Sequence, residues 1–105
     1  MEPLPIVVTA RLQARQGQAA ALEQQARALI LPTRAEQGCR VYALYRCPDR
    51  EGLFMFFEQW QSREALETHL RQPHVQAFMQ AAESLLEGRV AVTIWENVHD
   101  DVQTA

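Results

Sequence analysis

The segment Leu53–Trp60, with the sequence LFMFFEQW, constrains the fold more than any other part of the chain. Alternate side chains of a β-strand point to opposite faces of a sheet. Both faces of this strand would therefore be apolar, with Leu53, Met55 and Phe57 on one and Phe54, Phe56 and Trp60 on the other. Helices that cover one face of a sheet leave the other face open. We therefore expect a second sheet, most simply that of an identical subunit, to cover the open face.

The pattern of the remaining chain predicts three more strands around this one. Alternating or β-branched residues mark these strands at Ile6–Leu12, Cys39–Arg46 and Arg89–Trp95. The connector CPDREG between the second and third strands has the proline, aspartate and glycine of a hairpin loop. These two strands should therefore pair in antiparallel fashion.

Two segments have the three-and-four spacing of apolar residues that is typical of amphipathic helices. The first runs from Leu22 to Thr33, with a kink or early end expected at Pro32. The second begins at Ser62 as an N-cap, is interrupted at Pro73, and continues to Leu86.

The resulting order is β-α-β-β-α-β, which predicts an α+β, ferredoxin-like sandwich with one four-stranded antiparallel sheet. We expect a single domain over residues 1–105, with an ordered core at about 4–96 and a C-terminal tail at 97–105.

The charge and the cysteines narrow the range of partners and compartments. The net charge of -3 gives no basic surface, so neither nucleic acid nor an anionic membrane is expected as a partner. The N-terminus lacks a signal-peptide pattern, and no apolar stretch reaches membrane-spanning length. Cys39 and Cys47 would lie roughly 26 Å apart at the two ends of one strand, beyond the reach of a disulfide. A cytoplasmic location is the expectation.

The chain contains no lysine, since all ten basic residues are arginine. Schiff-base chemistry, pyridoxal phosphate attachment and a P-loop lysine are thereby excluded. Its two serines, Ser62 and Ser84, lie outside any Gly-x-Ser-x-Gly motif, which disfavours a serine hydrolase.

A carboxylate, an indole and two imidazoles lie within the short segment Glu58–His74, and a further run of such residues begins at Glu36. Their order and spacing resemble those of the antibiotic biosynthesis monooxygenase (ABM) family, and within it the quinol monooxygenases. The residues that carry this resemblance are Glu36-x-Gly38-Cys39-x-x-Tyr42 and Glu58-x-Trp60-x-Ser62-x-x-x-Leu66-x-x-His69-x-x-x-Pro73-His74.

The resemblance implies a homodimer in which two ferredoxin-like sheets form a shared α/β barrel. It also implies that each subunit oxygenates a hydroquinone or polyphenol with O2 and without flavin, haem or metal. Such chemistry needs a base near neutral pKa to deprotonate the phenol, and a dry aromatic cavity to hold it. Histidine is the side chain whose ordinary pKa fits this role best.

On this reading His69 is the hypothesised catalytic base. The substrate-binding candidates are Trp60, Phe54 and Phe56 as a wall for the ring, with Tyr42, His74 and Glu58 as hydrogen-bonding groups. Each candidate also has a structural interpretation. The histidines can cap helix ends, the aromatic residues can be ordinary core, and Glu58 can pair with an arginine.

We expect no metal site, because His69 and His74 are five residues apart across a proline and do not form a recognised ligand motif with Glu58. Haem degradation, another activity in this fold family, is disfavoured. The axial histidine and the first-strand asparagine of those relatives would fall near Met79 and Ala10.

Two alternative functions remain open at this point. The first is processing or isomerisation of a small phosphorylated signalling molecule, for which Arg11, Arg34 or Arg40 would bind the phosphate. The second is a dimer that binds a hydrophobic small molecule without catalysis.

Overall fold

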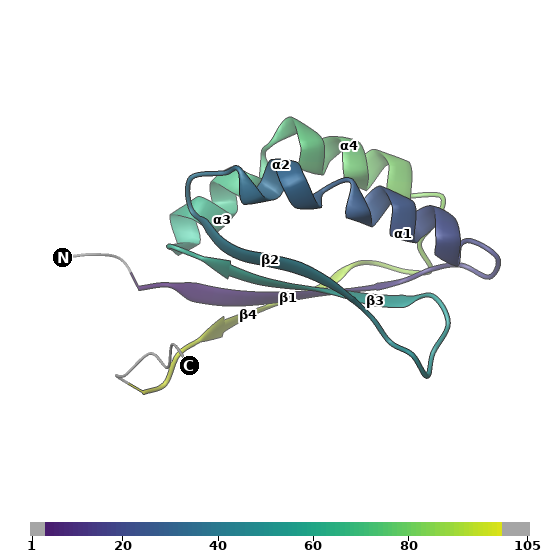
Figure 1. The fold of residues 1–105 in the computed structure, drawn as a ribbon, viewed down its shortest axis with the longest axis horizontal. Helices are drawn as coiled ribbons and strands as arrows, with labels where there is room; N and C mark the ends of the chain where they lie inside the picture. Colours follow the sequence, from purple (N-terminus) through teal and green to yellow (C-terminus); the bar gives the residue numbers. More distant parts are fainter. Residues whose placement is uncertain (1–3, 100–105) are drawn as a thin grey trace.

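The computed structural model describes residues 4–99, which form one antiparallel sheet with helices on one of its faces (Figure 1). The elements in chain order are β1 (Ile6–Gln13), α1 (Ala19–Arg27), α2 (Ile30–Arg34), β2 (Cys39–Arg46), β3 (Leu53–Trp60), α3 (Arg63–Leu70), α4 (Pro73–Ala82) and β4 (Ala91–Glu96). The strand order is β2-β3-β1-β4. The ferredoxin-like prediction is confirmed, and of the predicted tail, residues 100–105 lie outside the described residues.

The hairpin of β2 and β3 has the boundaries that the sequence predicts, and its strands pair in antiparallel register. Within this register Tyr42 lies opposite Glu58, and on the other side of β3 the residue opposite Glu58 is Val8 of β1. These three residues form a row across the middle of the sheet, on the face that the helices cover. The sheet register thus places a carboxyl and a phenol side by side in the interior.

The first helical segment differs from the single kinked helix that the pattern predicts. It breaks at Ala28 and Leu29, so that Pro32 lies in the first turn of α2. A proline within a continuous helix would clash with the carbonyl four residues before it, which is the carbonyl of Ala28. In the first turn of a new helix its missing N–H costs no hydrogen bond, and the break therefore precedes the proline by one turn.

The last helix ends earlier than predicted, at Ala82 rather than near Leu86. Backbone pairing explains the difference, because Arg15 N–H donates to the Leu85 carbonyl and Glu87 N–H donates to the Gln13 carbonyl. Residues 85–87 thus pair with the end of β1 instead of continuing the helix. The last strand begins after this pairing, at Ala91 rather than at Arg89.

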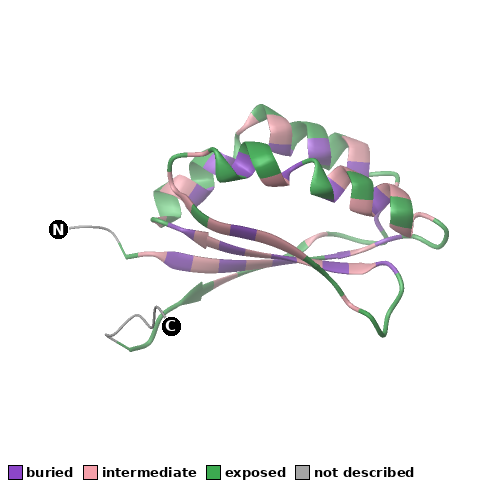
Figure 2. Cartoon of the chain, viewed as in Figure 1, coloured by how far each residue is buried: buried purple, intermediate pink, exposed green. Residues whose placement is uncertain are grey.

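Buried residues alternate with half-buried or exposed residues along β1 and β3 (Figure 2), so the two faces of the sheet differ in exposure. The helix-covered face carries the fully buried side chains of Val8, Leu12 and Trp60. The opposite face leaves Met55 and Phe57 half-buried and leaves more than half of Tyr45 and Trp95 exposed. The apolar character of both faces of β3 is thus confirmed. No helix within residues 4–99 is long and apolar enough to cross a membrane.

Candidate functional site

A cavity of about 590 Å³ lies between the sheet and helices α3 and α4. Its wall is mostly aliphatic and aromatic, with contributions from Val8, Ala10, Leu12, Phe56, Leu66, Val75, Phe78, Met79 and Ile94. The polar and ionisable side chains on the wall are Tyr42, Glu58, His69, Glu83 and Arg89. This combination of apolar lining and a few polar groups is typical of a small-molecule site. The cavity volume lies within the usual range for pockets that bind drug-sized ligands.

His69 reaches this cavity because of how α3 begins. The Ser62 hydroxyl accepts a hydrogen bond from the Ala65 N–H at 3.1 Å, which fixes the first turn of the helix. Leu66 and His69 are three residues apart, so they share one helix face, and both are buried against the sheet. The Trp60 indole lies against the imidazole with ring centroids 4.6 Å apart and restrains its orientation.

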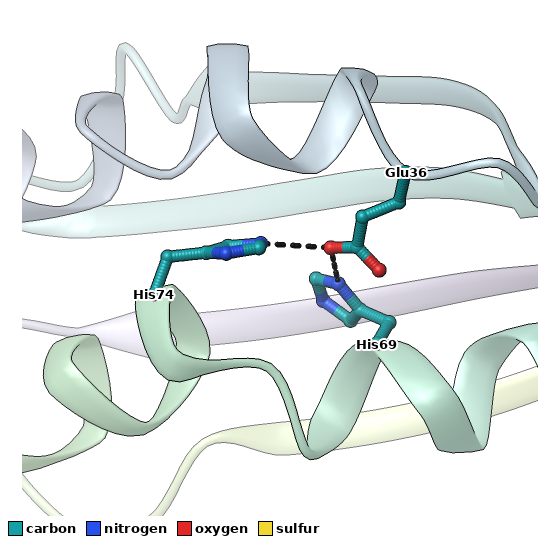
Figure 3. Close-up of side chains that lie close together, drawn as sticks. All are labelled: Glu36, His69 and His74. Atoms are coloured by element: carbon teal, nitrogen blue, oxygen red, sulfur yellow. Dashed lines mark hydrogen bonds and ion pairs between the residues drawn. The ribbon is translucent and has the colours of Figure 1, made fainter.

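Glu36 completes the site from the loop that follows α2 (Figure 3). Its Oε2 lies 2.7 Å from Nδ1 of His69 and 2.7 Å from Nε2 of His74. The two imidazoles, from α3 and α4, thus contact the same carboxylate oxygen of Glu36. Sequence reasoning had assigned no role to Glu36, although the residue belongs to the motif that carries the family resemblance. The available signal was a carboxylate two residues before Gly38, the glycine that precedes β2.

The hydrogen bond to Glu36 favours one tautomer of the His69 ring. An ionised carboxylate only accepts hydrogen bonds, so Nδ1 of His69 carries the proton and Nε2 keeps its lone pair. Burial lowers the pKa of His69, while the nearby Glu36 carboxylate acts in the opposite direction. His69 is therefore neutral at pH 7, and its second nitrogen can accept a proton in the cavity.

Glu58 is a buried carboxyl on the same wall. Trp60 Nε1 donates a hydrogen bond to its Oε1 at 2.8 Å. The structural interpretation in which Glu58 pairs with an arginine is wrong, because no arginine among residues 4–99 forms an ion pair with it. Burial raises the pKa of Glu58 to about 7, the Trp60 hydrogen bond opposes this shift, and Glu36 adds to it. At neutral pH a large fraction of Glu58 is therefore protonated and can donate a hydrogen bond.

The raised pKa of Glu58 makes stability depend on pH. The pKa of Glu58 is about 7 in the folded state and has the ordinary value of 4.5 in the unfolded state. Between pH 4.5 and about pH 7 the folded protein therefore binds more protons at this residue than the unfolded chain does. Wild-type stability therefore falls as pH rises from 4.5 to about 7, by up to about 3 kcal/mol from this group.

The Glu58→Gln variant should lack this loss while retaining the acceptor for the Trp60 hydrogen bond. We expect the free energy of unfolding of the variant, relative to that of the wild type, to increase by about 2–3 kcal/mol from pH 4 to pH 8. Urea unfolding at each pH measures this difference. Comparison of the two proteins at each pH cancels the titration of all other groups. A stability difference that does not change over this range would contradict the protonated state of Glu58.

The structure assembles only part of the predicted substrate-binding set on the cavity wall. Phe56, Tyr42 and Glu58 lie there together with His69. Phe54 instead lines a small hollow next to Ile30, toward α1 and α2. Trp60 is completely buried behind His69, and His74 faces an outer groove.

The placement of other residues bears on the alternative functions. Within residues 4–99, none of Arg11, Arg34 and Arg40 lines the cavity, and Arg34 Nε donates a hydrogen bond to the backbone carbonyl of Tyr42. The arginine cluster that a phosphorylated substrate would need is therefore not assembled there. The two positions compared with haem-degrading relatives, Ala10 and Met79, do line the cavity.

Fold and site together define a ferredoxin-like domain with a largely apolar cavity between the sheet and the helices. The chain belongs to the antibiotic biosynthesis monooxygenase family, whose model matches residues 5–81. A Mycobacterium tuberculosis protein named "Putative monooxygenase Rv0793" is 41% identical over 90 residues, which cover 86% of this chain and 88% of that protein.

Two solved structures share the fold of this chain. The structure of Rv0793 superposes with a TM-score of 0.86 at 38% identity, over 93% of this chain and 99% of that chain. The structure of PA3566 from Pseudomonas aeruginosa superposes with a TM-score of 0.88 at 34% identity, over 94% of this chain and 99% of that chain.

Proposed function

We propose that this protein is a homodimeric, cofactor-independent monooxygenase that oxidises a quinol or a similar phenol with O2. The observation that carries the proposal is the position of His69. Its ring forms part of the wall of an apolar cavity, and a carboxylate behind it fixes the proton on Nδ1. Such an arrangement orients a neutral imidazole as a general base, as the carboxylate does for the histidine in Ser-His-Asp triads.

The proposed reaction begins with a proton transfer from the substrate hydroxyl to Nε2 of His69. The resulting phenolate is electron-rich enough to reduce O2, and its negative charge needs a hydrogen-bond donor. Protonated Glu58 lies on the same wall and can serve as that donor. Tyr42 stacks on Phe56 with ring centroids 4.9 Å apart, and together they offer a flat surface to the aromatic ring.

The reaction balances without an external reductant. A hydroquinone that reacts with one O2 forms a new C–O bond, releases one water, and yields a hydroxyquinone. Of the four electrons that O2 accepts, two come from the C–H bond that is hydroxylated and two from oxidation of the hydroquinone to the quinone. The apolar wall excludes bulk water from the reactive intermediates.

Oxygen consumption tests this function. We expect metal-stripped protein to consume O2 in a saturable manner with at least one member of a panel of hydroquinones, catechols and anthrones. Autoxidation without protein and with heat-denatured protein gives the background rate. No uptake above this background across the panel would contradict the proposal, and tight ligand binding without uptake would favour a non-catalytic binding dimer.

The homodimer is proposed from the outer face of the sheet, where half-buried Met55 and Phe57 lie on β3 near exposed aromatic residues. An apolar face of this kind is costly to leave in water. We expect light scattering to give twice the 12.0 kDa chain mass. The Phe57→Asp variant should be monomeric, because it places a charge in the interface.

A matched control for this experiment is Leu31→Asp, since Leu31 is 77% exposed on the helical layer. This variant introduces the same charge outside the proposed interface and should remain a dimer. A wild-type protein that elutes as a monomer at all concentrations would contradict the proposed assembly.

A further inference from the structure

We infer that Glu36, His69 and His74 form a binding site for one divalent transition-metal ion, of which Zn²⁺ is the best match. Each residue offers one ligand atom to the cluster: Oε2 of Glu36, Nδ1 of His69 and Nε2 of His74. All three atoms lie within 4.8 Å of one another. It is the only such group of three among residues 4–99.

The ligand chemistry favours a borderline metal ion over calcium or magnesium. Two imidazole nitrogens and one carboxylate oxygen form a three-ligand set that zinc and ferrous sites use when they keep open positions. Metal–ligand bonds of about 2.0–2.2 Å hold tetrahedral ligand atoms about 3.3 Å apart. The two N···O distances of 2.7 Å would therefore lengthen by about half an ångström as the ion replaces the shared hydrogen bonds.

The surroundings of the cluster give the ion access from an outer groove and hold one of its ligands in place. Glu36 and His74 line an outer groove of about 680 Å³ whose other walls include the polar side chains of Gln37, Gln61 and Gln72. An ion can thus reach the cluster without crossing the apolar cavity. The His74 side chain is 22% exposed and free to adjust, whereas His69 is held by its contact with Trp60.

Metal binding would exclude the base role of His69, and this consequence rests on the proposed function. In the hydrogen-bonded state Nδ1 carries the proton and Nε2 has the lone pair. A metal ion takes the lone pair of Nδ1, so that the proton of the neutral ring moves to Nε2. His69 could then no longer accept a proton from a substrate, and zinc would act as an inhibitor of the oxygenase.

Direct binding measurements test the site without any substrate. We expect chelator-treated full-length protein to bind one Zn²⁺ per chain in isothermal titration calorimetry. Co²⁺ should give the visible absorption bands of a four- or five-coordinate site. The ¹⁵N shifts of the His69 ring should change from a protonated to a metal-bound Nδ1. His74→Ala and Glu36→Gln should each weaken Zn²⁺ binding more than about 100-fold, since even loss of an outer-shell partner costs about 10–100-fold.

Matched controls separate this site from other metal-binding groups. His99→Ala removes a histidine outside the cluster, and Cys39→Ser with Cys47→Ser removes both free thiols. Both control proteins should bind Zn²⁺ as the wild type does. Absence of binding, or binding that survives His74→Ala and Glu36→Gln unchanged, would overturn the inference. Because no turnover is measured, either result leaves the oxygenase proposal to be decided by oxygen uptake.

Discussion

Replacement of His69 by asparagine is expected to lower kcat/KM for phenol oxygenation by about 10²–10⁴-fold, the usual contribution of a general base. The asparagine amide can take over the hydrogen bond from Nδ1 to Glu36, which is 2.7 Å long in the structure. Asparagine has no atom in the place of Nε2, so the variant lacks the base but keeps the hydrogen bond to Glu36. The loss should appear in steady-state oxygen uptake, with little change in substrate binding measured separately.

The matched control is His99→Asn, the same substitution at an exposed histidine that follows β4 and does not line the cavity. Its oxygen uptake should equal that of the wild type. Circular dichroism and thermal unfolding establish that both variants fold. A folded His69→Asn protein with full activity would remove His69 from the mechanism.

Replacement of Gly38 by alanine is expected to destabilise the fold by about 3 kcal/mol, at the upper end of the usual cost of overpacking. The backbone angle φ at Gly38 is not positive, so alanine is compatible with the local conformation. The requirement for glycine comes from packing, since an added Cβ would overlap the Cβ of Ala65 on α3. Urea unfolding measures the loss.

This close approach also sets the geometry of the site. Gly38 lies two residues after Glu36, and Ala65 lies one turn before His69. A Cβ at position 38 would push α3 away from the loop and lengthen the Glu36–His69 hydrogen bond. Gly38→Ala should therefore reduce oxygen uptake as well as stability.

A double-mutant cycle with Ala65→Gly tests the cause. Removal of the opposing Cβ should restore most of the stability lost in Gly38→Ala, apart from about 1 kcal/mol for glycine within a helix. If the two substitutions are simply additive, the close contact is not the source of the destabilisation.

The fold could be predicted from the sequence because its signals are local. The turn residues of the CPDREG connector and the runs on either side of it defined β2 and β3 to the residue, and the side chain of Ser62 marked the start of α3. The end of α4 could not be found in this way. Its apolar periodicity continues to Leu86, but residues 85–87 pair with β1, and such long-range pairing leaves no local pattern.

The site was predicted only in part for the same reason. His69 and Glu58 could be selected as polar residues next to apolar stripes, and both are buried on the cavity wall. The contact of Glu36 with His69 and His74 depends on how closely the loop before β2 approaches α3. Strand alternation placed Phe54 and Phe56 on the correct face, but Phe54 lines a separate small hollow with residues of α1 and α2 and not the cavity.

The fate of the oxygen atoms of O2 distinguishes a monooxygenase from an enzyme or binding protein of another kind. Metal-stripped protein would react under ¹⁸O2 with a quinol that supports oxygen uptake, with rapid quenching and mass spectrometry of the product. We expect a hydroxyquinone with one ¹⁸O atom derived from ¹⁸O2. This label should be absent when the ¹⁸O is in the water instead, and the labelled product should be strongly reduced with His69→Asn. A product without label from ¹⁸O2, or a labelled product formed equally fast by His69→Asn, would contradict a base-assisted monooxygenase.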